Sequence, residues 1–454
     1  MRTKALLFSL LAVFAGVIAV TAALKINYKS YEASPAAMSD ASKTVLWNKK
    51  RTEEKTPFDY SGAARQISAL SSSEISEEML KTLDEKTVSS LLSALETAED
   101  IPSAWHSATG FTLNAFIDKN SPSASKDMGS NGKDLFTIGF TGDINFTDTG
   151  YVMTHAKTKE NGVLDCIDPV FITAMQNADI MFVNNEFPYS DRGSPTPGKK
   201  YTFRSPTENV KYMVKLGVDI VSLANNHAYD YGPDSFADTM ETLENAGILF
   251  VGAGNNIGQA EKAVSFIVNG YKVSFLAACG VESPIKTPVA TENSEGIMGS
   301  YDDGRRLVRC VEKAKEESDY VIVFPHWGIE NTTELTDAQR VNAKKYIDAG
   351  ASAVIGCHSH CLQGMEYYKG VFIAYSLGNF WFNTKTLYTA LLTLTVSDDG
   401  IVPSVIPGLQ KGSETRYLES ESERLALYDD IMDMPPRKNV AIDENGIISE
   451  KPER

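Results

Sequence analysis

The chain has 454 residues, and its 43 Lys and Arg against 59 Asp and Glu give a formal net charge of −16 at pH 7. This balance disfavours nucleic acid as a partner, because phosphate groups need a basic protein surface. An anionic substrate would therefore need a local cation, either an arginine or a bound metal ion. The five cysteines, an odd and sparse number, do not make a disulfide scaffold.

The N-terminus contains a candidate membrane anchor. Arg2 and Lys4 precede an uncharged run over residues 5–24, which at roughly 20 residues is about long enough to cross a bilayer as a helix. The basic residues would hold the N-terminus in the cytoplasm and place everything after Lys25 outside. A cleaved signal peptide is the alternative, with the small residues at 20–23 as its cleavage site. The first interpretation predicts a single-pass protein of the cell membrane with an extracytoplasmic body.

The remaining chain divides by composition. Residues 25–134 are polar and indicate a stalk, in which apolar residues at helical spacing between 71 and 100 predict one or two amphipathic helices. The end of this stretch, 118–134, has the composition of a linker. We expect the globular body over 135–410, followed by a polar tail over 411–454 with one helix.

Strands and helices alternate through the expected body. Apolar runs predict strands at 135–143, 179–187, 217–227, 249–254, 319–328 and 352–360, and helical patterns predict helices near 235–247 and 336–349. The Asn-Gly pair at 269–270 predicts a hairpin turn, and a second hairpin is expected within 365–380. This mixture predicts an α/β fold with sheet packed on sheet and helices outside.

Polar side chains follow five of the predicted strands, a position that favours functional residues. They are Asp143, Glu186, Asn226 with His227, His326, and the pair His358 and His360. Of the five histidines in the body, only His155 lies elsewhere. Mixed oxygen and nitrogen ligands suit Mn, Fe or Zn, and this set exceeds the needs of one tetrahedral zinc. The pattern therefore predicts two divalent ions that share a bridging carboxylate.

Seven sequence blocks carry a family resemblance. They run from about Phe136 to Phe382 in the order FTGDIN, FVNNEFP, YTFRSP, GVDIVSLANNHAYDYG, FPHWGIE, GCHSH and IAYSLGNF. The order of the polar residues resembles that of the calcineurin-like metallophosphoesterases. The residues within each block resemble more closely the CapA family of poly-γ-glutamate capsule biosynthesis proteins. The resemblance implies the calcineurin-like fold, which has two packed mixed β-sheets flanked by helices.

The resemblance also implies a role for each residue. Asp143 and His360 would bind one ion, Glu186 would bridge both, and the second ion would take Asn226, His326 and His358. His227 would bind no metal and would act as general acid or charge stabiliser beside a metal-activated water. At Asn145 the phosphoesterases usually carry histidine, so Asn145 is a weaker or absent ligand. The bridging residue is Glu rather than the usual Asp.

Four further positions keep two interpretations each. Arg204 is a candidate clamp for an anionic group, or part of a structural salt bridge. Asp230 would orient His227, or cap the turn before Gly232. Cys357 and Cys361 would form a small disulfide, or stay two buried thiols. We expect His358 and His360 to alternate along an extended turn, so that period two points both the same way and both converge on one site.

Three functions remain open. The resemblance implies a membrane-anchored, metal-dependent hydrolase or transferase for synthesis, export or anchoring of a poly-γ-glutamate-type capsule polymer, with membrane synthase subunits as partners. A surface metallophosphoesterase acting on nucleotides or envelope phosphoesters is the second. The third is a non-catalytic accessory subunit of a polymer synthase, favoured by Asn145 if the site is weakened.

Overall fold

The computed structural model describes residues 63, 67, 85–97, 125–282, 286–437 and 439–452. The predicted anchor over 1–24 lies outside these residues. Among the helices that are described, none is both long enough and apolar enough to cross a membrane. Contacts divide the chain into two units, Met1–Ala98 and Glu99–Arg454. In the first unit, helix α5 (Glu85–Thr97) lies where the apolar spacing predicts a helix, and it buries Val88, Leu91 and Leu95.

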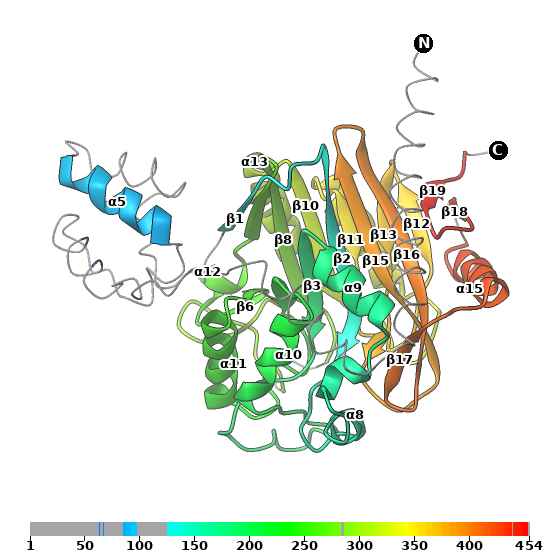
Figure 1. Cartoon of the computed structure of the whole chain (residues 1–454), viewed down its shortest axis with the longest axis horizontal. Coiled ribbons are helices and arrows are strands. Elements are labelled where there is room, and N and C mark those ends of the chain that lie inside the picture. Colours follow the sequence, from blue (N-terminus) through cyan, green and yellow to red (C-terminus); the bar gives the residue numbers. More distant parts are fainter. Residues whose placement is uncertain are drawn as a thin grey trace, which may run out of the picture. The chain divides into compact units, whose positions relative to one another are not determined.

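Two β-sheets form the centre of the second unit (Figure 1). The eight-stranded sheet has the order β17-β16-β15-β2-β3-β4-β5, and β14 pairs with β2. Its strands are β2 (Leu135–Ile144), β3 (Ile180–Asn185), β4 (Ile220–Ser222), β5 (Leu249–Val251), β14 (Asn379–Trp381), β15 (Leu387–Ser397), β16 (Gly400–Lys411) and β17 (Glu414–Tyr417). Strands β2 to β5 are mutually parallel, so their carboxyl ends meet at one edge.

The seven-stranded sheet has the order β1-β7-β8-β10-β11-β13-β12. Its strands are β1 (Ser125–Gly129), β7 (Val264–Val268), β8 (Tyr271–Cys279), β10 (Tyr320–His326), β11 (Ala353–Ile355), β12 (Met365–Tyr368) and β13 (Val371–Ala374). Strands β8, β10, β11 and β13 run parallel, so this sheet also gathers its carboxyl ends at one edge. The predicted hairpin at 269–270 is confirmed: Asn269 and Gly270, both at positive φ, join β7 to β8.

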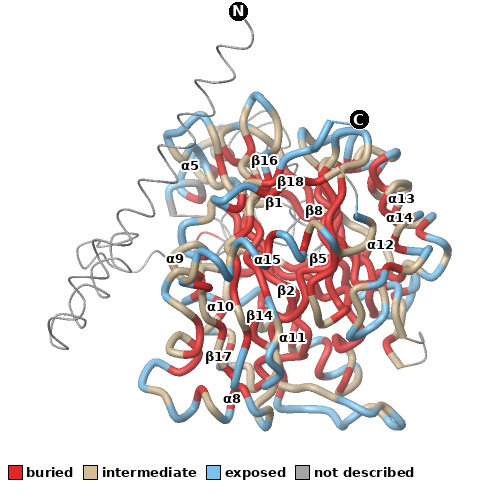
Figure 2. Tube along the Cα trace, turned by 90° about the vertical axis from the view of Figure 1, so that its right-hand side faces the viewer, coloured by how far each residue is buried: buried red, intermediate tan, exposed pale blue. Residues whose placement is uncertain are grey.

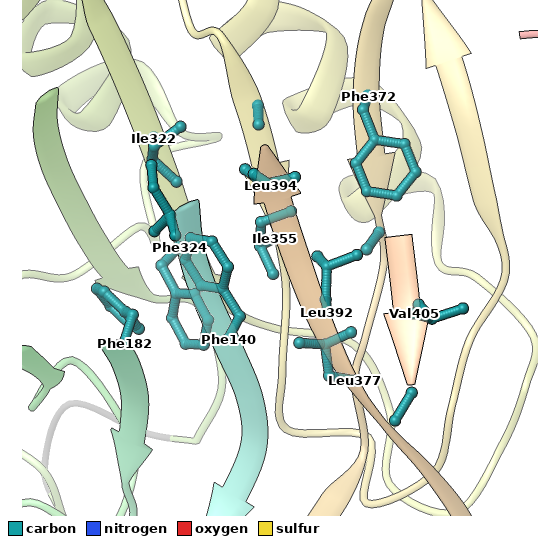
Figure 3. Packing of buried hydrophobic residues seen from close by; sticks show 14 of the residues in the cluster. Phe140, Phe182, Ile322, Phe324, Ile355, Phe372, Leu377, Leu392, Leu394 and Val405 are labelled. Atoms are coloured by element: carbon teal, nitrogen blue, oxygen red, sulfur yellow. The ribbon is translucent and has the colours of Figure 1, made fainter. Parts of the chain in front are cut away.

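The two sheets pack face to face through aromatic and aliphatic side chains (Figure 3). The rings of Phe140 and Phe182 on the first sheet contact Phe324 on the second, with centroids 6.5 and 4.5 Å apart. Residues on the opposite faces, such as Met181 and Val323, are buried as well, as Figure 2 shows for the strands generally. Strands buried on both faces explain the continuous apolar runs in the sequence.

Helices cover both outer faces. Apolar side chains of α9 (Pro169–Asn177), α10 (Val210–Lys215) and α11 (Pro233–Asn245) pack on the eight-stranded sheet. Those of α13 (Arg305–Glu317) and α14 (Asp337–Asp348) pack on the seven-stranded sheet. Thr336 begins α14 with a capping box to Gln339, and Pro233 occupies the first turn of α11. The predicted α/β class, with two packed sheets between helices, is confirmed.

Both sheets extend past the boundaries that composition predicts for the body. Strand β1 lies within the expected linker and pairs in parallel with β7 at the sheet edge. At the other end, β17 lies beyond residue 410. Before it, β15 and β16 form a long hairpin that the sequence patterns do not predict, because Pro403 and Pro407 lie in β16. Proline is tolerated there since β17 pairs with β16 only from Gly408 onward. Beyond it lie α15 (Glu421–Asp433), in the predicted helical stretch, and the ribbon of β18 (Val440–Ile442) and β19 (Ile448–Glu450).

Candidate metal centre

The eight-stranded sheet places two carboxylates side by side. Asp143 is near the end of β2 and Glu186 directly follows β3, and both are fully buried. Asn184, which pairs with Asp143 across the two strands, donates to Asp143 Oδ1 at 2.7 Å. Its Nδ2 also lies 3.5 Å from Glu186 Oε2. Gly142 is required here, since an added Cβ would lie 1.9 Å from the carbonyl oxygen of Gly378.

The loop after β4 adds the amide and the first imidazole. Asn225 fixes this loop: its Nδ2 donates to the Asn185 carbonyl at 3.0 Å, and its Oδ1 accepts from the His227 backbone at 3.0 Å. Asn226 then projects toward the other sheet, with Oδ1 2.7 Å from His326 Nε2. The loop therefore carries one potential ligand across the gap between the sheets.

The seven-stranded sheet supplies three imidazoles. His326 ends β10, and His358 and His360 follow β11. His358 Nδ1 lies 3.0 Å from His326 Nε2, while His360 Nδ1 lies 2.9 Å from Asn379 Oδ1 and 3.3 Å from Asp143 Oδ2. The imidazoles of His358 and His360 thus contact different partners.

The two histidines lie in a turn and both reach the site, as expected, but the expectation that this turn is extended is wrong. His358 has φ 95° and His360 has φ 55°, both in the left-handed region. A tight turn, rather than the period of a strand, brings both rings to the site. Non-glycine residues adopt positive φ only where surrounding contacts impose it, and such strain concentrates at functional sites.

The donor set fits divalent metal ions. Within the described residues, Asp143 Oδ2 and Glu186 Oε1 are buried and accept no hydrogen bond. Ligand atoms of Asp143, Glu186 and His360 lie within 4.8 Å of one another, and so do those of Glu186, His326 and His358. Glu186 belongs to both groups, which is the bridging arrangement that the resemblance implies. A buried carboxylate oxygen that accepts no hydrogen bond is costly, and a bound cation would offset that cost.

The electrostatics of the site match this donor set. Burial raises the pKa of Glu186, and the adjacent Asp143 raises it further. Burial lowers the pKa of His326 well below its usual range and that of His358 to about 3, so both rings are neutral, as metal binding requires. Burial alone would lower the pKa of His360, but the neighbouring Asp143 outweighs it and the net shift is upward.

Cys357 lies beside the cluster as a free thiol. Its Sγ is 3.1 Å from His326 Nδ1, and with Asp143 and His326 it makes a third group of close donor atoms. Burial raises the pKa of this thiol well above its usual range, which disfavours the thiolate that would bind metal. His326 turns Nε2, the other ring nitrogen, toward Glu186 and His358. We therefore read Cys357 as a neighbour that orients His326. Cys361 is also a free thiol, so the predicted alternative of a disulfide between them is absent.

His227 and Asp230 form a buried pair. His227 Nδ1 lies 2.7 Å from Asp230 Oδ2, and its Nε2 lies 4.0 Å from Glu186 Oε1. The ring of Phe203 covers that of His227 at 4.2 Å, and Phe382 lies 4.8 Å from the ring of His360. Asp230 therefore has the geometry of the orienting residue rather than only of a turn cap.

Two predicted positions make their contacts outside the cluster. Asn145 Oδ1 accepts a hydrogen bond from the Thr147 backbone at 2.7 Å, which occupies it in a local turn. Arg204 lies over the ring of Tyr231 at 4.2 Å and donates to the Arg192 carbonyl at 3.0 Å. Neither contact reaches the carboxylates or imidazoles of the site.

Sequence reasoning did not assign three residues that contact the candidate site residues. Asn184 and Asn225 stand in the blocks FVNNEFP and GVDIVSLANNHAYDYG, and in each block a run of two asparagines was the available signal. Lys199, whose side chain is only 3% exposed, pairs with Asp230 at 2.7 Å. No pattern in the sequence distinguishes it from the exposed Lys200 beside it.

Comparisons with known proteins match the part of the chain that contains the seven sequence blocks. The family described as "Bacterial capsule synthesis protein PGA_cap" matches residues 137–384. The PGA biosynthesis protein CapA of Bacillus subtilis is 30% identical over 272 residues, 59% of this chain and 69% of the relative. The capsule biosynthesis protein CapA of Bacillus anthracis is 32% identical over 251 residues, 53% of this chain and 60% of the relative. A "Probable polyglutamine synthesis accessory protein" of Mycobacterium tuberculosis is 27% identical over 208 residues, 44% of this chain and 55% of the relative.

Solved structures with some likeness include two enzymes. A 5'-nucleotidase from Candida albicans has a TM-score of 0.36 at 12% identity, covering 60% of this chain and 51% of its own. The sulfate thiohydrolase SoxB of Thermus thermophilus has a TM-score of 0.32 at 14% identity, covering 64% of this chain and 47% of its own.

Proposed function

The chain belongs to the bacterial capsule synthesis protein family, and from this we propose that it is a metal-dependent hydrolase or transferase that acts on a poly-γ-glutamate-type capsule polymer. The single observation that supports the chemistry is the pair of buried carboxylate oxygens, on Asp143 and Glu186, that face imidazoles of the opposite sheet. Its place in the cell is part of the proposal: a single-pass membrane protein whose body lies outside the cytoplasm, as the N-terminal run of the sequence suggests.

Two divalent ions are proposed for the centre. Asp143 and His360 would hold one, Asn226, His326 and His358 the other, and Glu186 both. Such a pair, when bound, polarises the scissile bond and lowers the pKa of water. Mn, Fe and Zn all suit this mixture of oxygen and nitrogen ligands.

His227 is proposed to move the proton. Since Asp230 Oδ2 faces Nδ1 at 2.7 Å, the ring carries its hydrogen on Nδ1, and Nε2 is left to exchange a proton with the substrate. Phe203 and Phe382 contact each other with centroids 5.5 Å apart, beside His227 and His360. These partly exposed rings would exclude water from one side of the reacting bond.

Hydrolysis of γ-linked glutamate chains tests this function directly. The full-length protein, supplied with Mn or Zn, should shorten poly-γ-glutamate or transfer its chains to an amine, and Glu186→Ala should abolish both the activity and the bound metal. Cleavage of nucleotides or envelope phosphoesters, with none of the polymer, would replace this proposal with the surface phosphoesterase. Full activity in Glu186→Ala would contradict a metal-dependent reaction.

One observation favours an accessory subunit as second candidate. Asn145 Oδ1 is occupied by the Thr147 backbone, so the ion beside Asp143 would lack the ligand that a histidine gives at this position in the phosphoesterases. Such a protein would support a membrane synthase without cleaving the polymer. Normal capsule in cells that carry only Glu186→Ala would favour this candidate over the enzyme.

A further inference from the structure

A buried lysine joins three loops behind the metal centre. Lys199 lies in the loop after β3, and its side chain is 3% exposed although the residues around it are mostly exposed. Its ammonium is 2.7 Å from Asp230 Oδ1 and 2.9 Å from Glu282 Oε2, and it donates to the Asn226 carbonyl. The three N–H groups of the ammonium thus have three oxygen neighbours, as a buried charge requires.

The partners of Lys199 lie in loops that follow strands of different sheets. Asn226 and Asp230 lie in the loop after β4, of the eight-stranded sheet, whereas Glu282 lies in the loop after β8, of the seven-stranded sheet. Thr287 Oγ1 strengthens the junction, at 2.7 Å from the Asn226 carbonyl and 3.0 Å from Glu282 Oε2. The lysine therefore connects the two edges that carry the proposed ligands.

Two of the partners lead directly into the site. The Asn226 carbonyl belongs to the residue whose Oδ1 lies 2.7 Å from His326 Nε2. Asp230 turns Oδ1 to Lys199 and Oδ2 to His227 Nδ1, and Oδ2 also accepts from the Phe203 backbone at 2.7 Å. A shift of the ammonium would therefore displace both the amide and the imidazole.

We propose that Lys199 is a positioning residue that fixes Asp230, and through it the ring of His227, while holding the Asn226 amide in place for metal. It touches neither substrate nor the reacting atoms. The proposal rests on the proposed function only for the role of the metal; the fixed orientation of His227 is a property of the chain itself.

The test compares Lys199→Met with Lys200→Met. Lys200→Met is the control, because Lys200 matches Lys199 in residue type and chain position but is exposed, with its Nζ over the ring of Tyr201. In metal-free full-length protein, nitrogen NMR should show one tautomer of His227 in the wild type and in Lys200→Met, and a mixture in Lys199→Met. Calorimetry with Mn²⁺ should show about tenfold weaker binding in Lys199→Met, the effect typical of lost outer-shell partners. Lys199→Arg, which keeps the cation, should restore most of both.

A second variant separates positioning from charge balance. Lys199→Met/Glu282→Gln removes a cation and an anion together, so it leaves no unpaired Glu282 and covers the case in which the single variant does not fold. If Lys199 only neutralises Glu282, this variant should show the wild-type signal of His227, and that result overturns the proposal. An unchanged His227 signal in Lys199→Met overturns it too. Absence of Mn²⁺ binding in the wild type would instead count against the proposed function, while the NMR comparison still decides the role of Lys199.

Discussion

The carboxyl edge of the eight-stranded sheet presents candidate oxygen ligands, whereas that of the seven-stranded sheet presents candidate nitrogen ligands. Asp143, Glu186 and Asn226 come from the first edge, and His326, His358 and His360 from the second. Each proposed ion therefore takes ligands from both sheets. His227 is the exception, an imidazole on the first edge, and it is the one that pairs with a carboxylate of its own loop.

This difference shows how the fold assembles the site. Two buried carboxylates on one edge repel each other, and Asn184 alone does not satisfy them. Packing the second sheet on the first brings imidazoles opposite these oxygens: His360 Nδ1 lies 3.3 Å from Asp143 Oδ2, and His326 Nε2 lies 3.8 Å from Glu186 Oε1. The packed aromatic core between the sheets, Phe140, Phe182 and Phe324, thus sets the distance between the two halves of the site.

The largest expected effect comes from removing two of the three imidazoles on the edge of the seven-stranded sheet. We call His326, His358 and His360 the nitrogen half of the site, and Asp143, Glu186 and Asn226 the oxygen half. His358→Ala/His360→Ala should lose nearly all bound metal, because each proposed ion loses one ligand. Plasma mass spectrometry of the purified protein measures this. His155→Ala is the matched control, since His155 pairs with Glu414 at 3.1 Å outside the site and its loss should leave the metal content unchanged. Retained metal in the double variant would mean that the second edge is not needed.

The stability of the metal-free protein should depend on pH through the nitrogen half. Burial lowers the pKa of His358 to about 3, so between pH 6.5 and 3 the unfolded chain binds a proton that the folded chain does not. The unfolding free energy of metal-free protein should therefore fall, by a few kcal/mol in total, as the pH drops through this window. Denaturant titrations at several pH values measure the slope, and His358→Asn should flatten it. The same slope in His358→Asn would contradict this assignment.

In the oxygen half, a substitution should raise the stability of the metal-free protein while it weakens metal binding. Glu186→Gln removes a buried carboxyl group whose charged form is disfavoured by burial and by Asp143, so metal-free protein should become more stable by about 2 kcal/mol while losing the stabilisation that added Mn²⁺ gives. Glu414→Gln is the contrasting control: despite partial burial, hydrogen bonds from His155, Lys159 and Arg416 lower the pKa of Glu414 to about 2, so its loss should destabilise. A destabilised metal-free Glu186→Gln would show that the charge is satisfied without metal.

The smallest expected effect sharpens the comparison at a single position. Asn145→His adds an imidazole to the oxygen edge, at the position where the phosphoesterases carry histidine. Mn²⁺ titration should show tighter binding of the weaker ion, with the other ion unchanged, and Asn145→Ala gives the reference for loss of the turn to Thr147. Equal binding in Asn145→His and Asn145→Ala would show that this position does not face the ion.

The sequence predicted the parts of this molecule that have a simple period or a strong turn signal. The apolar runs that became β2, β3 and β10, and the hairpin at Asn269, follow from such patterns. The hairpin of β15 and β16 was missed because proline is normally excluded from central strands, whereas Pro403 and Pro407 lie before the stretch of β16 that pairs with β17.

The candidate site, like the fold, was predictable only where the sequence has a simple pattern. Residues after strand ends were visible as a pattern, whereas the turn at His358 and His360 was not, because its positive φ values depend on tertiary contacts. Lys199 and Asn184 act through distances between loops far apart in sequence, which no spacing reveals. The roles of all these residues toward metal remain predictions.

The number of ions per chain tests the central claim most directly. Full-length protein purified without chelator, supplied with Mn or Zn and then dialysed, should contain about two ions per chain by plasma mass spectrometry, and Glu186→Ala should contain almost none, because both ions share that carboxylate. Wild-type protein without metal, or Glu186→Ala with the wild-type content, would contradict a centre built by two sheets around one bridging glutamate.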